Sequence, residues 1–141
     1  MRKETQYWRV SSNNMRSIQL ALQAKTWGVS YRGKNTIRQM SKGDKIVIYL
    51  TRTASFVAIC QVSKEFFFDS SFIWEVDDYP HRIGIEPLLV PKKPLKLEKA
   101  RKDAERPNLG GSFGRTTVVR LTSEDFDLIL NMMTTTESSR D

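Results

Sequence analysis

Cysteine and histidine are scarce in this sequence, which has one of each among its 141 residues. The single cysteine, Cys60, rules out an internal disulfide and a cysteine-based metal cluster. Because Cys60 lies in the apolar run 56–62, we expect it to be a buried, unreactive thiol. The single histidine, His81, is too few for a histidine-rich metal site, so we expect neither a metal nor another cofactor.

Recognisable catalytic motifs are also missing. The chain has no G-x-S-x-G nucleophile motif, and the Lys42-Gly43-Asp44-Lys45 turn lacks the glycine spacing of a phosphate-binding loop. The carboxylates of Glu75, Asp77 and Asp78 are able to hold a divalent metal, but adjacent carboxylates more often form a solvated turn. We therefore expect a protein that is not an enzyme.

Long apolar runs are absent, and none approaches the length of a membrane-spanning helix. The charged start, residues 1–6, holds no signal-like segment, so we expect a soluble, cytoplasmic protein with no membrane partner. A chain of 141 residues is long enough for one domain with a core and too short for two. Residues 1–141 are expected to form a single domain, and the polar end, residues 134–141, is expected to fray.

Positive charge is in excess, with 23 lysines and arginines against 16 aspartates and glutamates and a net charge of +7. Basic side chains release condensed counterions when they meet a phosphate chain, so this balance suggests a polyanionic partner. Part of the excess lies in residues 91–106, which are predicted to be a linker or an exposed helix. Aromatic residues are interspersed among the basic ones, and base stacking combined with phosphate attraction is the leading interpretation.

The hydrophobic pattern predicts several short strands and two flanking helices. Strand patterns cover residues 7–11, 45–50, 56–62, 81–88 and 117–121. The second and third of these are joined too closely for a helical crossover, so an antiparallel hairpin is expected. One helix is predicted to begin near Asn14, a helical turn at 36–40, and a last helix after Thr122. This arrangement favours an α+β fold with a small, curled, mostly antiparallel sheet.

Polar residues at the end of the first strand precede an isolated tryptophan. Ser12, Asn13 and Asn14 provide hydroxyl and amide groups, and Trp27-Gly28 follows the first predicted helix. Amide donors and acceptors beside an indole face are what a pocket for a flat heteroaromatic ring needs. An indole in a loop is poorly placed for the core, and both a ligand-facing role and a packing role remain open for Trp27. Trp8, in a strand pattern, is expected to pack in the core.

An ordered set of motifs resembles the EVE domain family. The set comprises Tyr7-Trp8, Ser12-Asn13-Asn14, Thr26-Trp27-Gly28-Val29, Lys42-Gly43-Asp44, Tyr49, Phe56, Tyr79-Pro80-His81-Arg82-Ile83 and Thr122-Ser123-Glu124-Asp125-Phe126. The resemblance implies a PUA-like fold similar to that of YTH domains, a curled mixed or antiparallel β-barrel with flanking helices. It also implies that the protein binds nucleic acid and draws a modified base into an aromatic cage.

The resemblance further implies roles for particular residues. Trp27 becomes a cage wall, and Ser12, Asn13 and Asn14 are placed to hydrogen-bond the edge of the base. The other base-binding candidates are Gly28, Tyr49, Phe56, Trp74 and Tyr79. The phosphate-binding candidates are Arg32, Lys34, Arg38, Arg52 and Arg82.

The expected partner is DNA or RNA that carries a methylated or hydroxymethylated cytosine or an N6-methyladenine. The sequence leaves open the base, the polymer and the oligomeric state. An alternative is an ASCH-type amidohydrolase acting on modified nucleosides, for which Thr51, Lys64 and Glu65 offer the residue types. A third interpretation is an interaction module whose aromatic side chains simply pack, in which case removing Trp27 lowers stability without a separate binding defect.

Overall fold

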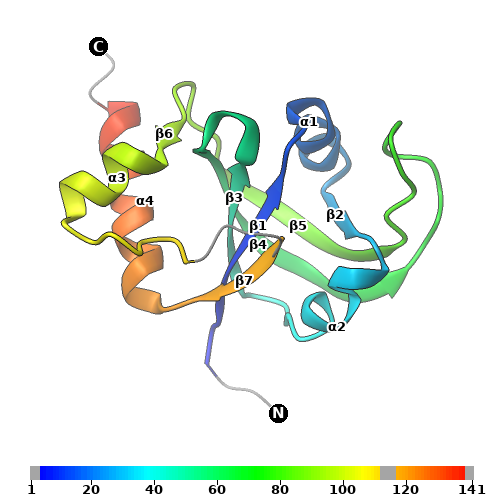
Figure 1. The fold of residues 1–141 in the computed structure, drawn as a ribbon. Helices are drawn as coiled ribbons and strands as arrows, with labels where there is room; N and C mark the ends of the chain where they lie inside the picture. The colour runs from blue at the N-terminus through cyan, green and yellow to red at the C-terminus, as the bar shows by residue number, and fades with distance from the viewer. Residues whose placement is uncertain (1–3, 112–116, 139–141) are drawn as a thin grey trace.

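The computed structural model describes residues 4–111 and 117–138. Its centre is one mixed sheet with helices on both sides (Figure 1). The strands in chain order are β1 (Tyr7–Ser12), β2 (Thr26–Val29), β3 (Lys45–Leu50), β4 (Ser55–Phe68), β5 (His81–Leu89), β6 (Leu95–Lys96) and β7 (Val118–Leu121). The main path is β2-β5-β4-β3-β1-β7, and β6 pairs with the start of β4. With its helices this is the expected α+β fold.

The strand pairing confirms the predicted β3–β4 hairpin, which is antiparallel. The pairing of β1 with β3 is parallel, because α1, β2 and α2 intervene along the chain and carry it back to the same end of the sheet. Among the described strands, β2 and β7 stand at opposite ends of the path without pairing with each other. The sheet is therefore open, and the barrel implied by the family resemblance is not confirmed.

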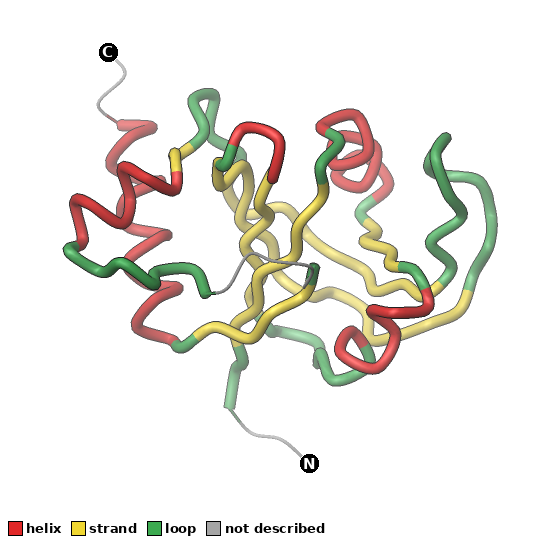
Figure 2. Tube along the Cα trace, viewed as in Figure 1, coloured by secondary structure: helices red, strands yellow, loops and turns green. Residues whose placement is uncertain are grey.

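The two described ranges also contain four α-helices and two short 3₁₀ turns, which lie between the strands except for the last helix, which follows β7 (Figure 2). They are α1 (Met15–Ala24), η1 (Tyr31–Gly33), α2 (Lys34–Ile37), η2 (Thr51–Thr53), α3 (Leu97–Ala104) and α4 (Ser123–Ser138). The predicted N-cap of α1 is confirmed, since Oδ1 of Asn14 accepts a hydrogen bond from the Ser17 amide at 3.1 Å. No helix in these ranges combines the length and apolar character needed to cross a membrane.

Each face of the sheet has its own apolar core. In Figure 1, α1 and α2 lie on one side of the sheet and α3 and α4 on the other. Side chains of β3 alternate between the two: Ile46 and Ile48 belong to the first core, Val47 and Tyr49 to the second. Trp8, 2% exposed, packs in the first core, as expected, and its Nε1 donates to Asp44 Oδ2 at 3.0 Å.

Three segments differ in detail from the sequence-based expectations. Trp27 lies in β2, not in a loop, because residues 26–29 pair in register with the start of β5. The basic segment 91–106, expected to be a linker or an exposed helix, does contain a helix, α3, and in addition the short strand β6, which the sequence pattern does not predict. The polar end, expected to fray from residue 134, continues α4 to Ser138, since Ile129 and Met133 anchor the preceding turns in the second core; residues 139–141 lie outside the described part.

Candidate functional site

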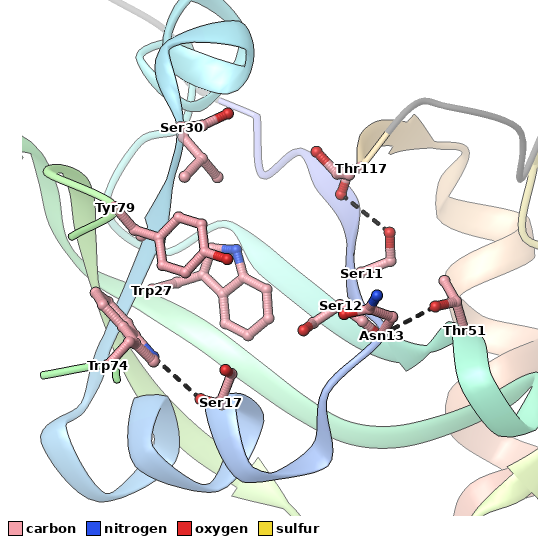
Figure 3. Close-up of a pocket in the computed structure, with 12 residues that line it drawn as sticks. Ser11, Ser12, Asn13, Ser17, Trp27, Ser30, Thr51, Trp74, Tyr79 and Thr117 are labelled. Carbon is pink, nitrogen blue, oxygen red and sulfur yellow. Dashed lines mark hydrogen bonds between the residues drawn. The ribbon is translucent and has the colours of Figure 1, made fainter. Parts of the chain in front are cut away.

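A cavity of about 380 Å³ opens where β1, α1 and β2 meet the segment 69–80 (Figure 3). Its lining residues are Ser11, Ser12, Asn13, Ser17, Trp27, Gly28, Val29, Ser30, Thr51, Trp74, Tyr79 and Thr117. Figure 3 shows two unlike walls, with the rings of Trp27, Trp74 and Tyr79 on one side and hydroxyl and amide side chains on the other. We call this cavity the aromatic pocket.

The aromatic wall comes from two elements. Trp27 is presented by β2, opposite Ile83 of β5, and is 6% exposed. The Trp74 and Tyr79 rings meet edge to face, with centroids 5.5 Å apart and planes at 80°. Trp74 is further fixed by its indole Nε1, which donates to the Ser17 carbonyl in α1 at 3.1 Å.

Gly28 allows the segment 69–80 to lie directly on β2. A β-carbon at this position would stand 2.5 Å from the carbonyl oxygen of Tyr79 and 2.8 Å from the ring of Trp74. Any larger residue therefore has to displace backbone or a buried indole. Tyr79 itself has a φ of 42°, in the left-handed region that non-glycine residues rarely adopt, so the surrounding contacts must hold this backbone in place.

Arg82 supplies several of those contacts. Its guanidinium donates to Tyr79 O at 3.1 Å, Asp78 O at 3.0 Å, Ser71 O at 2.6 Å and Ser71 Oγ at 3.1 Å. It also lies 5.1 Å from the Trp74 ring centroid. Arg82 is among the predicted phosphate-binding residues, but it is 1% exposed and occupied by the segment 69–80, so it is a structural residue instead.

The polar wall is the corner between β1 and α1. The hydroxyl of Ser12 accepts from the Asn14 amide at 3.2 Å, which turns the chain into the helix. The hydroxyls of Ser11 and Thr51 each make one long contact of 3.4 Å to a backbone carbonyl, of Thr117 and Ser12 respectively. These weak contacts leave the hydroxyls free to exchange partners when a ligand enters.

None of the described lining residues carries a formal charge. The ionisable one among them is Tyr79, and burial, reinforced by the nearby Asp77 carboxylate, raises the pKa of its phenol above the ordinary value. The pocket therefore offers stacking faces and neutral hydrogen-bonding groups. Such a lining suits a flat, uncharged, heteroaromatic group, and its volume is within the usual range of about 300–1,000 Å³ for small-molecule sites.

The pocket contains many of the predicted base-binding residues but not all of them. Ser12, Asn13, Trp27, Gly28, Trp74 and Tyr79 line it. Asn14 does not, because its side chain caps α1. Tyr49 and Phe56 face the opposite side of the sheet, where their rings meet at 5.2 Å in the second core. Both are at most 3% exposed, so they are core residues and not walls of the pocket.

Sequence reasoning missed half of the described lining residues. They are Ser11, Ser17, Val29, Ser30, Thr51 and Thr117. A local signal existed for Ser11, which precedes Ser12 in the same strand, and for Val29 and Ser30, which follow Trp27-Gly28. Thr51 and Thr117 reach the pocket through strand pairing with distant segments, and nothing in the sequence indicates that pairing.

The remaining phosphate-binding candidates follow pocket residues along the chain. Arg32 and Lys34 follow Ser30 in η1 and α2, with Arg38 at the end of α2. Arg52 follows Thr51 in η2. Arg32, Arg38 and Arg52 are exposed, and Lys34 is half-buried. Basic residues therefore follow the pocket residues Ser30 and Thr51 in the chain, while the described lining of the pocket is neutral.

Within the described part of the chain, the side chains considered for metal binding or for hydrolysis do not come together. Among the described residues, no group of three or more histidine, cysteine, aspartate or glutamate side chains could hold a metal ion. Of the residues considered for amide hydrolysis, Thr51 lines the pocket. Lys64 instead lies 4.2 Å from the Phe67 ring centroid, and Oε2 of Glu65 accepts from the Lys42 amide at 3.3 Å.

Comparison with known proteins gives consistent results. A family model described as the EVE domain matches residues 6–132. UPF0310 protein PH1033 of Pyrococcus horikoshii is 28% identical over 145 residues, which cover 90% of this chain and 98% of that protein. A hypothetical protein from Leishmania major has a similar structure, with a TM-score of 0.71 at 19% identity, covering 94% of this chain and 97% of that one.

A YTH domain has a similar fold. The YTH domain of the Zygosaccharomyces rouxii MRB1 protein, solved in complex with N6-methyladenosine RNA, gives a TM-score of 0.70 at 13% identity. The match covers 93% of this chain and 88% of that one. Because both solved structures are less than 20% identical to this chain, their similarity to it establishes a shared fold.

Proposed function

Because this chain belongs to the EVE domain family, we propose that it binds single-stranded nucleic acid and takes one modified base into the aromatic pocket. The base enters between the rings of Trp27, Trp74 and Tyr79 and the polar corner formed by Ser12 and Asn13. The candidate modifications are methyl or hydroxymethyl groups on cytosine, or a methyl group on N6 of adenine. The domain acts by binding and performs no chemistry on the base.

The main support for this proposal is the difference in charge between the pocket and the chain as a whole. The chain has a net charge of +7, whereas no described lining residue of the pocket is charged. Phosphates are attracted to basic side chains, and bases are bound by stacking and by neutral hydrogen bonds. A neutral aromatic cavity, with the basic residues Arg32 and Arg52 close in sequence to its lining residues Ser30 and Thr51, allows a base and its phosphates to be bound by different groups, as a flipped nucleotide requires. The YTH domain bound to N6-methyladenosine RNA lends further support through its similar fold.

Selectivity for a modified base follows from the aromatic wall. A methyl group adds apolar area that the indole rings cover, and one such group in a pocket is worth roughly 1–3 kcal/mol. The free-energy difference between binding the modified and the parent base also includes the water displaced by the methyl group and any change in hydrogen bonds at the polar corner. We therefore expect a preference of at least about tenfold for the modified base over its parent.

The test is a titration of matched oligonucleotides by fluorescence anisotropy. Single strands of about nine nucleotides, a length typical of one small binding domain, are prepared as DNA and as RNA. Each carries at its centre cytosine, 5-methylcytosine, 5-hydroxymethylcytosine, adenine or N6-methyladenine. One modified base is expected to bind at least about tenfold tighter than its parent. Equal binding of all the oligonucleotides would contradict the proposal.

Two variants show whether the pocket causes the preference. Trp27→Phe keeps an aromatic ring in β2 but reduces the stacking area, and Asn13→Ala removes an exposed amide from the polar corner. Both variants are expected to reduce the ratio of the affinity for the modified base to the affinity for its parent. Asn131→Ala is the matched control, since Asn131 is exposed on α4, beyond the opposite face of the sheet. If Asn131→Ala and Trp27→Phe had the same effect, the pocket would not be the binding site.

A further inference from the structure

A second group of aromatic side chains lies exposed beside the aromatic pocket. Tyr31 and Phe68 are 74% and 66% exposed, which is unusual for side chains of this size. His81 lies between them, with ring centroids 6.2 Å from Tyr31, 5.4 Å from Phe68 and 6.0 Å from Phe66. The Phe66 and His81 planes are nearly parallel, at 16°. We call these four residues the aromatic platform.

The platform is built mainly on paired strands and has basic neighbours. Residues Phe66, Phe68 and His81 belong to the paired strands β4 and β5, and Phe68 is directly opposite His81 in the ladder. Nζ of Lys34 lies 4.4 Å from the Tyr31 ring centroid, and the guanidinium of Arg38 lies 5.1 Å from that of Phe66.

The acidic residues Glu65 and Asp69, which are close in sequence to Phe66 and Phe68, have contacts of their own. Asp69 accepts from the Ser71 amide at 2.8 Å and lies 3.7 Å from the guanidinium of Arg82, and Glu65 accepts from the Lys42 amide. Lys34 and Arg38 place positive charge directly against two rings of the aromatic platform.

Two short connections join the platform to the aromatic pocket. Ser30 lines the pocket and Tyr31 is the next residue, about 3.8 Å away along the backbone. Just before the neighbouring strand β5, Tyr79 lines the pocket, and His81 follows two residues later as the first residue of that strand. Val29 and His81 are paired across β2 and β5, which fixes this spacing. A ligand strand that leaves the pocket on this side would therefore pass over the platform.

Exposed rings flanked by cations match the chemistry of a nucleotide and not that of a purely apolar partner. Every base has a π-face that stacks on an aromatic side chain whatever its sequence, and the adjoining phosphate is attracted to lysine and arginine. The ring of His81 stacks on Phe66 and meets Tyr31 and Phe68 edge to face, and its buried Nδ1 makes no hydrogen bond in the described part of the chain.

We propose that the aromatic platform binds the nucleotides adjacent to the pocketed base, stacking them on Tyr31 and Phe68 while Lys34 and Arg38 contact the intervening phosphates. This inference rests on the proposed function, because it treats the pocket as the site of the modified base. The platform then supplies affinity that does not depend on sequence, and the pocket supplies the preference for the modification. A free nucleoside reaches only the pocket, whereas an oligonucleotide reaches both.

The test compares two probes against variants of the platform. The probes are the free modified nucleoside and a single strand of about nine nucleotides carrying the same base at its centre. Tyr31→Ala and Phe68→Ala remove exposed rings, so the fold is expected to be retained. Leu88→Ala is the control, because Leu88 is 52% exposed on β5 and is not part of the platform.

We expect each platform variant to weaken oligonucleotide binding by roughly fivefold or more and to leave nucleoside binding unchanged. Leu88→Ala should leave both unchanged. Unaltered oligonucleotide binding in Tyr31→Ala and Phe68→Ala would overturn the inference, as would equal losses for both probes, which would mean that the platform only shapes the pocket. A shift from dimer to monomer in size-exclusion chromatography without a binding defect would identify the platform as a contact between copies of the chain, and would also overturn it.

Failure of the proposed function gives a different pattern. If Trp27→Phe leaves binding of both probes unchanged while Tyr31→Ala weakens the oligonucleotide, the pocket is not the base site and the platform is a nucleic-acid surface in its own right. If Trp27→Phe weakens both probes and the platform variants weaken neither, the proposed function stands and the platform inference fails.

Discussion

At the level of single residues, Gly28 determines how closely the segment 69–80 approaches β2. The Tyr79 carbonyl and the Trp74 ring occupy the space that a side chain would need. Gly28→Ala is therefore expected to push the aromatic wall outward. Overpacking of this kind costs about 1–3 kcal/mol of stability, and displacement of two of the three rings should weaken nucleoside binding by at least about tenfold. Urea denaturation and a nucleoside titration measure the two effects.

The control for Gly28→Ala is a destabilising change on the other side of the sheet. Ile129→Val removes one methylene from the second core, where Ile129 is fully buried on α4. It should cost about 0.5–1.5 kcal/mol and leave nucleoside affinity unchanged. If Ile129→Val impaired binding as much as Gly28→Ala, the binding defect would reflect general instability.

Tyr79 makes a specific prediction about pH. Burial, with help from Asp77, raises the pKa of the phenol, so the hydroxyl stays neutral to a higher pH than an ordinary tyrosine, whose pKa is about 10. Tyr79 therefore stays neutral from about pH 6 to pH 9, and the other described lining residues are not ionisable. Affinity for N6-methyladenosine or 5-methylcytidine should stay constant over this range. Isothermal titration calorimetry across this range is the measurement. A fall in affinity already between pH 8 and 9, roughly a unit below the ordinary phenol pKa, would mean that Tyr79 is deprotonated earlier than its buried position allows.

At the level of elements, the segment 69–80 has no regular structure and depends on Arg82 for its shape. The planar guanidinium donates four hydrogen bonds to it, and a lysine ammonium at the same place cannot reproduce that fork. Arg82→Lys is expected to lower stability by about 1.5–3 kcal/mol and to weaken nucleoside binding while the net charge stays the same. Thermal unfolding and the nucleoside titration report these changes.

Arg106→Lys is the matched control for Arg82→Lys. Arg106 is 39% exposed and pairs with Glu124 and Asp125 at 3.3 Å and 2.8 Å. An exposed ion pair contributes at most about 1 kcal/mol, so this variant should resemble the parent in both measurements. Equal losses in the two variants would show that the effect is common to any arginine-to-lysine change and does not come from the fork of Arg82.

Elements with a local signal were predictable from the sequence, and those that depend on distant pairing were not. The β3–β4 hairpin follows from two β-branched runs with a short connection, and the start of α1 follows from Asn14. The strand β2 has four residues, one of them Gly28, and exists because β5 supplies a partner far along the chain. No pattern within residues 26–29 predicts that they pair with β5.

The same distinction holds for the pocket. Ser12 and Asn13 are predictable because a strand-to-helix corner is visible locally. The prediction for Tyr49 and Phe56 is wrong about the face of the sheet, because β3 and the first half of β4 are apolar on both faces. A continuous apolar run gives no alternation from which to read the face. Only the positions of α3 and α4, against which both rings pack, decide it.

At the level of the whole molecule, the two faces of the sheet have separate tasks. The second core, which contains Tyr49 and Ile129, is an apolar layer between the sheet and the helices α3 and α4. The first core continues into the aromatic pocket, since Trp27 and Trp74 belong to both. A packed core therefore positions the aromatic wall of the pocket, while Arg52, which follows the pocket residue Thr51, is exposed.

This separation predicts how salt affects binding. Phosphate contacts release counterions, so oligonucleotide affinity should fall as salt rises, with a logarithmic slope of about three if four basic side chains each contact a phosphate of a single strand. The pocket is neutral over its described lining, so the preference for the modified base should not change with salt. Anisotropy titrations of the modified and the parent oligonucleotide at several salt concentrations give both quantities. Parallel lines on a double-logarithmic plot are expected. Lines that converge at high salt would mean that charged side chains contribute to recognition of the modification, and the base would then have to be bound outside the neutral pocket.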